Sequence, residues 1–264
     1  MQSVSEIVSR LKLKANSEST SSSDYKCYQC KDTGMIFINI ANGEEVPASD
    51  VPASQQGGYY SKPCSCAIEK RILELMNNSG IDPEQYQKKN FSTFVAETEE
   101  QKKMKELALE FIRDKEALGF GVYGRSGTGK THICMAILGE LSKKGISHRY
   151  FNYRKDVREL VANKFNSDEY NKLMDRWTST KVLYIDDIFK FVVSNGKTNT
   201  EELRIMFEII NARYLNKKIT IFSSEFTGRD LLELDEAIGS RIIDITGRYG
   251  VKCTGNNYRI SRNN

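Results

Sequence analysis

The segment FGVYGRSGTGKT, residues 120–131, decides the fold of this 264-residue chain. Its last eight residues satisfy the pattern G-x-x-x-x-G-K-[ST], in which glycines let successive backbone N–H groups turn toward bound phosphates. The apolar run 120–123 before the glycines predicts a buried strand, and the apolar spacing after them predicts a helix over 131–144. A strand, a glycine loop and a helix N-terminus in this order predict a P-loop that binds ATP or ADP.

Two residues of the loop have separate expected roles. Lys130 is expected to reach the β- and γ-phosphates, and the Thr131 hydroxyl is expected to bind Mg²⁺. The alternative is a glycine loop that only happens to precede a helix, and the strand in front of the loop disfavours it. We therefore expect the nucleotide to contact the whole segment: Gly124, Arg125, Ser126, Gly127, Thr128, Gly129, Lys130, Thr131 and His132.

A second apolar run, KVLYIDD at 181–187, ends in two carboxylates. Ligands of open α/β sheets bind at the C-terminal ends of the strands. Asp186 is therefore expected on the Mg²⁺ side of the nucleotide, and Asp187 could orient or deprotonate the attacking water. On its own the pattern would fit a strand that ends in a solvated turn, but its position downstream of a P-loop disfavours that alternative.

Further apolar runs predict the rest of an α/β fold. The runs at 149–152 and 219–222 predict buried strands, while helical spacing over 98–116 and around 203–210 predicts helices. Strands that alternate with helices predict a parallel sheet covered by helices on both faces.

Two residues near the predicted sheet edge are candidates for contact with phosphate. Ser224 follows the run 219–222 and would lie beside the γ-phosphate. Arg241 follows a short predicted helix over 231–238, and arginines supplied by a neighbouring subunit commonly stabilise charge in phosphoryl transfer. The alternative for Arg241 is an ordinary surface arginine.

Four of the six cysteines form two close pairs, Cys27-Tyr-Gln-Cys30 and Cys64-Ser-Cys66. Four thiolates can complete a closed tetrahedral zinc site, which is structural and not catalytic. A redox pair or unliganded thiols are the alternatives, although no βαβ pattern surrounds the first pair. Cys134 and Cys253 are expected to be packed side chains.

Composition sets broad limits. Thirty-nine basic and 35 acidic residues give a net charge of +4, which permits contact with nucleic acid without arguing for it. Neither a signal peptide nor an apolar run long enough to cross a bilayer is present, so we expect no membrane partner and a cytoplasmic location with reduced cysteines. The expected domains are an N-terminal helix with a Ser-rich linker (1–24), a zinc-binding module (25–80) and an ATPase domain (81–264).

Together these segments resemble the AAA+ helicase loaders of the DnaC/DnaI type, within the IstB-like ATP-binding family, and especially the versions encoded by phages. The resemblance implies a P-loop AAA+ core that lacks a full C-terminal lid, joined to a small Cys-rich zinc module that contacts a hexameric replicative helicase. It also implies that the AAA+ domain binds single-stranded DNA and associates with its own copies. The segments that carry the resemblance are CYQCKDTG (27–34), KPCSC (62–66), GRSGTGKTH (124–132), VLYIDDI (182–188), FEIINARY (207–214), IFSSE (221–225), GSRIID (239–244) and NYR (257–259).

By motif, Arg241 resembles the arginine finger of the family and Arg259 resembles its second sensor. The segment NFSTF, which ends at Phe94, resembles the approach to the adenine pocket. Two positions depart from the usual pattern: many AAA+ proteins have Asp-Glu where this chain has Asp186 and Asp187, and the first sensor is usually Asn where this chain has Glu225. Both departures suggest a slow ATPase in which the nucleotide acts as a switch.

The favoured interpretation is an ATP-controlled helicase loader, in a bacterial cell or a phage-infected host, with ATP or ADP, Mg²⁺ and Zn²⁺ as cofactors. One alternative is an IstB-like transposition helper, which would bind duplex DNA and a transposase. Another is a zinc-bearing adaptor whose nucleotide site is vestigial. The stretch 143–154 interleaves basic and aromatic residues, as single-strand binders do, but residues 149–152 could equally be a buried strand.

Overall fold

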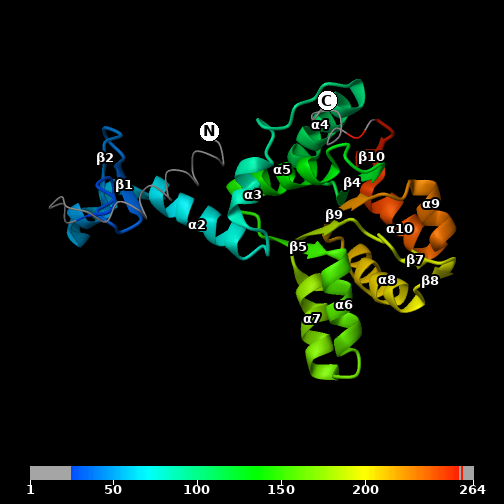
Figure 1. The fold of residues 1–264 in the computed structure, drawn as a ribbon. Coiled ribbons are helices and arrows are strands. Elements are labelled where there is room, and N and C mark those ends of the chain that lie inside the picture. The colour runs from blue at the N-terminus through cyan, green and yellow to red at the C-terminus, as the bar shows by residue number, and fades with distance from the viewer. Residues whose placement is uncertain (1–24, 256, 258–264) are drawn as a thin grey trace. The chain divides into compact units, whose positions relative to one another are not determined.

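The computed structural model describes residues 25–255 and 257, which divide between Glu74 and Leu75 into two compact units (Figure 1). We call them the N-terminal unit and the C-terminal unit. The boundary expected from the sequence, at residue 80, lies a few residues farther along the chain. The helix expected within 1–24 and Arg259 lie outside the described residues.

The N-terminal unit is built on a small antiparallel sheet with the strand order β2-β1-β3. Its strands are β1 (Met35–Asn39), β2 (Glu45–Pro47) and β3 (Tyr59–Pro63), with the 3-10 turns η1 (Ala48–Asp50) and η2 (Ala53–Gly58) between the last two. Helix α2 (Ser65–Asn77) follows the sheet. Among the described residues of this unit, the hydrophobic cluster around the cysteines has Cys30, Ile36 and Cys64 as its buried members. A core this small contributes little to folding, so a unit of this kind needs an additional constraint.

The C-terminal unit contains a five-stranded sheet with the order β10-β4-β9-β6-β5, in which every neighbouring pair is parallel. The predicted parallel α/β fold is therefore confirmed, and the edge strand β10 is an addition to it. Since all strands point the same way, the ends of β4, β6 and β9 meet at one edge of the sheet. The strands are β4 (Gly119–Gly124), β5 (His148–Asn152), β6 (Val182–Asp186), β9 (Ile219–Ser224) and β10 (Gly250–Cys253).

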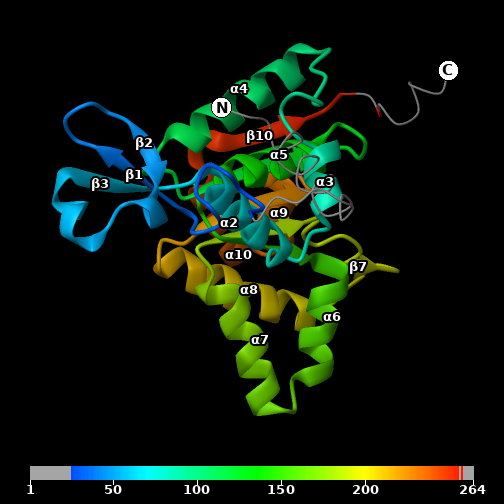
Figure 2. The same cartoon turned by 90° about the vertical axis from the view of Figure 1, so that its left-hand side faces the viewer.

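Helices cover both faces of this sheet: Figures 1 and 2 show α4 and α5 on one side and α8 and α10 on the other. None of the helices in the described residues is both long and apolar enough to span a bilayer. No helix follows β10 in the described stretch up to Gly255. The helices are α3 (Pro83–Lys88), α4 (Glu99–Arg113), α5 (Lys130–Lys143), α6 (Tyr153–Asn163), α7 (Ser167–Ser179), α8 (Thr200–Leu215), α9 (Gly228–Leu234) and α10 (Glu236–Thr246), with a hairpin of β7 (Val193–Ser194) and β8 (Lys197–Thr198) and the turn η3 (Gly247–Tyr249).

The prediction of a single helix over 231–238 was wrong, because this stretch is divided between α9 and α10. Asp235 has an extended backbone with φ of −161°, which ends α9, and its carboxylate accepts a hydrogen bond from the backbone N–H of Ile238 and so caps α10. An aspartate at this position is a favoured N-cap because its oxygen satisfies an N–H group that the helix leaves unpaired. Arg241 consequently lies within a helix and not after one.

One fully buried arginine joins three elements of the C-terminal unit. Arg213, near the end of α8, donates five hydrogen bonds, to the Thr220 hydroxyl and to the carbonyl oxygens of residues 177, 178, 180 and 219. Burial lowers the pKa of Arg213 to about 9, so the guanidinium still carries its charge at neutral pH. The charge therefore ties the C-terminal end of α7 and the start of β9 to α8. Five donors in a rigid planar group suit this geometry, and a lysine could not reproduce it.

We expect the change Arg213→Ala to reduce the free energy of unfolding by about 3–5 kcal/mol, because it leaves buried carbonyl groups without donors. Chemical denaturation of the full chain measures this loss. Arg204→Ala is the matched control: Arg204 lies on the same helix, but its side chain is 74% exposed and pairs only with Glu208. That control should change stability by no more than about 0.5 kcal/mol. Equal effects of the two changes would contradict the structural role of Arg213.

Candidate functional site

The P-loop connects the end of β4 to the start of α5, and several of its positions require glycine, among them Gly127 and Gly129. Gly127 has φ of +80°, and a Cβ built there would lie 1.9 Å from Oδ1 of Asn257. Gly129 has φ of +96°, caps the start of α5, and a Cβ there would lie 3.0 Å from the ring of Phe94. Both residues therefore lack side chains for steric and conformational reasons. The turn leaves the N-terminus of a 14-residue helix open toward the loop, an arrangement that attracts anions.

Lys130 is buried and its ammonium group is already held in place. Its Nζ donates hydrogen bonds to the carbonyl oxygens of Gly124 (2.7 Å) and Arg125 (2.8 Å). An ammonium group has three donors, so one N–H remains for a phosphate oxygen. Burial lowers the pKa of Lys130, and the carboxylates of Asp187 and Glu225 oppose this shift because they favour the charged form.

A cavity of about 680 Å³ lies against the P-loop. It brings together P-loop residues, both aspartates of the β6 end and the segment before α4, as the sequence predicts, and it adds Lys190, which the sequence analysis did not name. Its size and its charged lining suit a nucleotide. The lining residues are Lys89, Thr93, Phe94, Val95, Glu97, Gln101, Ser126, Gly127, Gly129, Lys130, Thr131, His132, Asp186, Asp187 and Lys190.

His132, in the first turn of α5, fastens that helix to the segment that lines the far side of the cavity. Its Nε2 lies 3.1 Å from the carbonyl oxygen of Asn90 and 3.2 Å from the hydroxyl of Thr93. Its ring meets the ring of Phe94 edge to face, with centroids 5.2 Å apart. His132 therefore orders one wall of the cavity.

Asp186 lies at the centre of a hydrogen-bond network. Its carboxylate accepts from Thr131 (3.2 Å), Tyr150 (2.9 Å) and Ser223 (2.6 Å), and also from the hydroxyl of Tyr184. These donors come from α5, β5, β9 and β6 respectively. Three of these donors reach Oδ1 and one, from Tyr150, reaches Oδ2, so they fix the orientation of the carboxylate while Oδ2 keeps a lone pair for a metal ion. Thr131 and Asp186, which are both expected to bind Mg²⁺, are thus in direct contact.

Asp187 lines the cavity next to Asp186 but is engaged in an ion pair. Lys190 lies 2.8 Å from Oδ2 of Asp187 and 2.9 Å from Oε1 of Glu225. Partial burial acts to raise the pKa of Glu225, but Lys190, Lys130 and Ser126 together outweigh it and the pKa is lowered. Lys190 therefore bridges the two carboxylates.

Five predicted residues of the described structure do not line the cavity: Gly124, Arg125, Thr128, Ser224 and Arg241. The carbonyl oxygens of Gly124 and Arg125 instead accept from Lys130, and the Thr128 hydroxyl donates to the carbonyl oxygen of Arg125. Ser224 is fully buried and its hydroxyl donates to the carbonyl oxygen of Ile188, while Ser223, one residue earlier, is the serine that reaches Asp186. Arg241 donates to the Asn211 side chain at 2.9 Å and to a carbonyl oxygen of its own helix, so it does not line the cavity of its own chain. Arg259 lies outside the described residues.

The aromatic residues proposed for DNA contact on β5 are used in packing. Tyr150 donates to Asp186, and Phe151 meets Trp177 edge to face with centroids 4.9 Å apart. His148 is buried beside Tyr86, with its Nε2 2.6 Å from the tyrosine hydroxyl, and burial lowers its pKa to about 4. The predicted strand is therefore confirmed, but it is a half-buried edge strand in which Arg149, Tyr150 and Asn152 are partly exposed.

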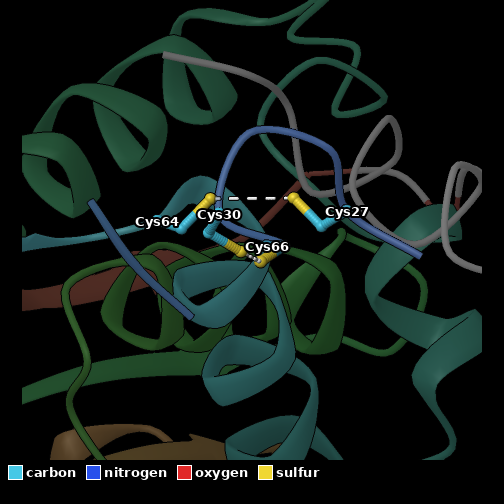
Figure 3. Close-up of side chains that lie close together, drawn as sticks. All are labelled: Cys27, Cys30, Cys64 and Cys66. Atoms are coloured by element: carbon cyan, nitrogen blue, oxygen red, sulfur yellow. Dashed lines mark hydrogen bonds between the residues drawn. The ribbon is translucent and has the colours of Figure 1, made fainter. Parts of the chain in front are cut away.

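The four N-terminal cysteines converge. Their sulfur atoms all lie within 4.8 Å of one another, and Figure 3 shows the side chains directed toward a common centre. Cys27 and Cys64 are 3.8 Å apart at sulfur, and Cys30 and Cys66 are 3.4 Å apart. A zinc ion with Zn–S bonds of about 2.3 Å requires tetrahedral S···S distances of about 3.8 Å. The four thiols therefore fit a structural zinc ion, and they are the only such cluster of metal-binding side chains in the described residues.

The backbone around the thiols forms the site through local contacts. The carboxylate of Asp32 accepts from the backbone N–H groups of Lys26 (2.9 Å) and Cys27 (2.8 Å), which folds the first pair into a tight turn. The N–H of Cys64 donates to the carbonyl oxygen of Gly34 at 2.8 Å, which brings the second pair against the first. The long gap between the two pairs is thus closed by the sheet of the N-terminal unit.

Sequence reasoning missed the partners of Asp186, although a signal for two of them exists. Tyr184 precedes Asp186 by two residues, and residues two apart on a strand share a face. Tyr150 lies opposite Tyr184 in the register of β5 and β6. No local signal indicates Ser223 or Lys190, because their contacts depend on how separate elements meet.

Two curated relatives are similar to this chain over most of their length. The uncharacterized protein YqaM of Bacillus subtilis (strain 168) is 29% identical over 271 residues, which cover 90% of this chain and 85% of YqaM. The phage-like element PBSX protein XkdC of the same strain is 30% identical over 248 residues, with 90% of this chain and 86% of XkdC covered.

Solved structures share the fold of the C-terminal unit. DnaI superimposes with a TM-score of 0.52 at 22% identity, over 67% of this chain and 93% of DnaI. The DnaC helicase loader superimposes with a TM-score of 0.53 at 21% identity, over 64% of this chain and 97% of the DnaC chain. The replication initiator DnaA bound to AMPPCP and single-stranded DNA gives 0.50 at 23% identity, over 62% of this chain and 49% of DnaA.

The sequence profile of the IstB-like ATP binding proteins matches residues 68–263, so it begins just after the last of the four clustered cysteines. The match covers most of the chain and contains the P-loop, both aspartates and Lys190. The membership that the motifs suggested is confirmed: this chain belongs to the family of IstB-like ATP binding proteins.

Proposed function

We propose that this protein is an ATP-controlled loader that binds a hexameric replicative helicase and places it on single-stranded DNA. The observation that carries the proposal is the cavity in which Lys130, Thr131 and Asp186 meet, in a chain that also holds a separate four-thiol unit. The likeness in fold to DnaI and the DnaC helicase loader, each covered almost completely, supports this proposal, as does the relative in a phage-like element.

ATP would bind with its phosphates at the N-terminus of α5. Lys130 has one N–H group beyond its two carbonyl contacts and would donate it to a phosphate oxygen. Thr131 and Asp186 would hold Mg²⁺, which neutralises phosphate charge and orients the phosphates. Phe94 and Val95 line the same cavity and would lie against the base.

We propose that hydrolysis is slow and that the bound nucleotide acts mainly as a switch. The carboxylate of Asp187, the candidate for orienting water, is paired with Lys190 at 2.8 Å. Arg241 lies away from the cavity of its own chain, which suits an arginine that acts on the nucleotide of a neighbouring copy. Self-association of the C-terminal unit would then complete each site.

The N-terminal unit would contact the helicase. Its hydrophobic cluster consists largely of cysteines, so a zinc ion bound by Cys27, Cys30, Cys64 and Cys66 would supply much of its stability. Reduced thiols suit a cytoplasmic location, and all six cysteines of the chain are free. The unit would thereby present a fixed surface that is independent of the nucleotide site.

Two other functions remain as outcomes of the experiments below. A transposition helper with the same ATP-binding domain would prefer duplex DNA to single strands. An adaptor with a vestigial nucleotide site is disfavoured, because Lys130, Thr131 and Asp186 line one cavity and two of them are hydrogen-bonded to each other.

The change Lys130→Ala should weaken the binding of both MgATP and MgADP by about tenfold to hundredfold, because a charged hydrogen bond to phosphate is lost. Titration with fluorescent nucleotide analogues measures the two affinities. Lys103→Ala, an exposed lysine on α4, is the control and should bind both nucleotides as the natural chain does. A Lys130→Ala protein with full affinity for both nucleotides would revive the vestigial adaptor.

The chain should bind one zinc ion, and Cys64→Ser should remove it. Loss of zinc, by this change or by a strong chelator, should expose residues 27–66 to protease while MgATP binding by the C-terminal unit persists. Elemental analysis and limited proteolysis of the full chain measure both effects. Cys134→Ala is the control, since Cys134 is buried on α5 outside the cluster and its loss should leave the zinc content unchanged. A natural chain without zinc after expression in zinc-supplied medium would contradict the assignment.

The loader function predicts co-migration of the chain with a hexameric replicative helicase in gel filtration, and tighter binding to single-stranded than to duplex DNA with MgATP. DNA binding by Lys130→Ala should no longer depend on the nucleotide. Cys64→Ser should no longer bind the helicase but should still bind the nucleotide. If none of the candidate helicases from the host or its phage associates, the loader function fails. Preferential binding to duplex DNA would favour the transposition helper.

A further inference from the structure

We propose that Lys190 is a second phosphate-binding cation, which contacts the γ-phosphate and so distinguishes ATP from ADP, and that Asp187 and Glu225 hold it in position. This inference rests on the proposed binding of ATP in the cavity. It assigns a role to a residue that lies outside the P-loop and outside the strand that carries Asp186.

The first support is the position of the ammonium group. Lys190 lines the same cavity as Ser126, Lys130 and Asp186. Two of its three donors are used, at 2.8 Å to Asp187 and 2.9 Å to Glu225, and its side chain is only 26% exposed. The third N–H remains for a phosphate oxygen, the same arrangement as at Lys130.

The second support is the charge of the cavity edge. Glu225 directly follows β9. It lies close enough to Lys130 and Ser126 of the P-loop for both to lower its pKa. A carboxylate there would repel a γ-phosphate if it were unpaired. Lys190 neutralises one of the two carboxylate charges that it bridges and places an N–H donor at this edge of the cavity. Lys190 and Glu225 therefore form one functional pair, in which Glu225 holds the ammonium group of Lys190 in position.

The third support is the conformation of the backbone around Lys190. Asp187, Phe189 and Phe191 have φ of 53°, 64° and 65°, a region that bulky residues rarely adopt. Such strain persists only where surrounding contacts enforce it, and it is concentrated at functional segments. Here the enforcing contacts are to Ser223, whose hydroxyl accepts from the N–H of Asp187 and whose carbonyl oxygen accepts from the N–H of Ile188. Together they turn the chain so that Lys190 points back toward the cavity.

The test is equilibrium binding of MgADP and of a non-hydrolysable MgATP analogue to four full-length proteins: the natural chain, Lys190→Met, Glu225→Gln and the double variant. Lys190→Met should lower the affinity for the ATP analogue by about tenfold to hundredfold, because the γ-phosphate loses a partner. The affinity for ADP should change by less than about threefold. Glu225→Gln alone should have a small effect, because Asp187 still holds Lys190. The double variant should regain part of the lost affinity for the ATP analogue, because the unpaired carboxylate is gone.

Lys197→Met is the matched control: Lys197 is exposed on the neighbouring hairpin and does not line the cavity, but the change removes the same charge. It should bind both nucleotides as the natural chain does. Equal losses of ATP and ADP affinity in Lys190→Met, or additive losses in the double variant, would overturn the role of Lys190 and leave nucleotide binding itself intact. Failure of the natural chain to bind either nucleotide would instead overturn the proposed function.

Discussion

The carboxylate of Asp186 is the point on which the nucleotide site depends. Four hydroxyl groups from four elements donate to it, from Thr131 on α5, Tyr150 on β5, Tyr184 on β6 and Ser223 on β9. The network ties three strands to the helix that carries the P-loop, so the group expected to hold Mg²⁺ is fixed before any ligand arrives. Preorganised polar groups of this kind lower the cost of binding a charged ligand.

The rest of the site follows from that constraint. Because β6 ends at Asp186, the next residues turn sharply, and the strained segment from Asp187 to Phe191 begins there. Ser223 accepts from the backbone of this segment and donates to Asp186, so the same serine orders the Asp186 carboxylate and the backbone of Asp187. Lys190 thereby lines the cavity together with Lys130, Asp186 and Asp187.

Much of this fold could be predicted because its signals are local. The P-loop pattern, the apolar strands that became β4, β6 and β9, and the two cysteine pairs each depend on a few neighbouring residues. What could not be predicted depends on contacts between distant segments: the edge strand β10, the buried Arg213 and the pairing of Lys190 with Glu225. The pattern predicts where β9 ends but not which of its faces turns to Asp186, and Ser223 and Ser224 lie on opposite faces, so Ser223 and not Ser224 reaches Asp186. The boundary between α9 and α10 at Asp235 had a local signal, because aspartate is a favoured N-cap residue. The apolar spacing continues across this position and predicts a single helix instead.

The central claim is that this chain binds a nucleotide with a divalent ion held by Asp186. Electron paramagnetic resonance of Mn²⁺, which can replace Mg²⁺, measures that ion directly. We expect one Mn²⁺ ion bound per chain, and only when ATP is present. Asp186→Asn should bind no Mn²⁺, whereas Lys190→Met should still bind it at saturating ATP. Mn²⁺ binding that does not require ATP, or that survives Asp186→Asn unchanged, would contradict the account.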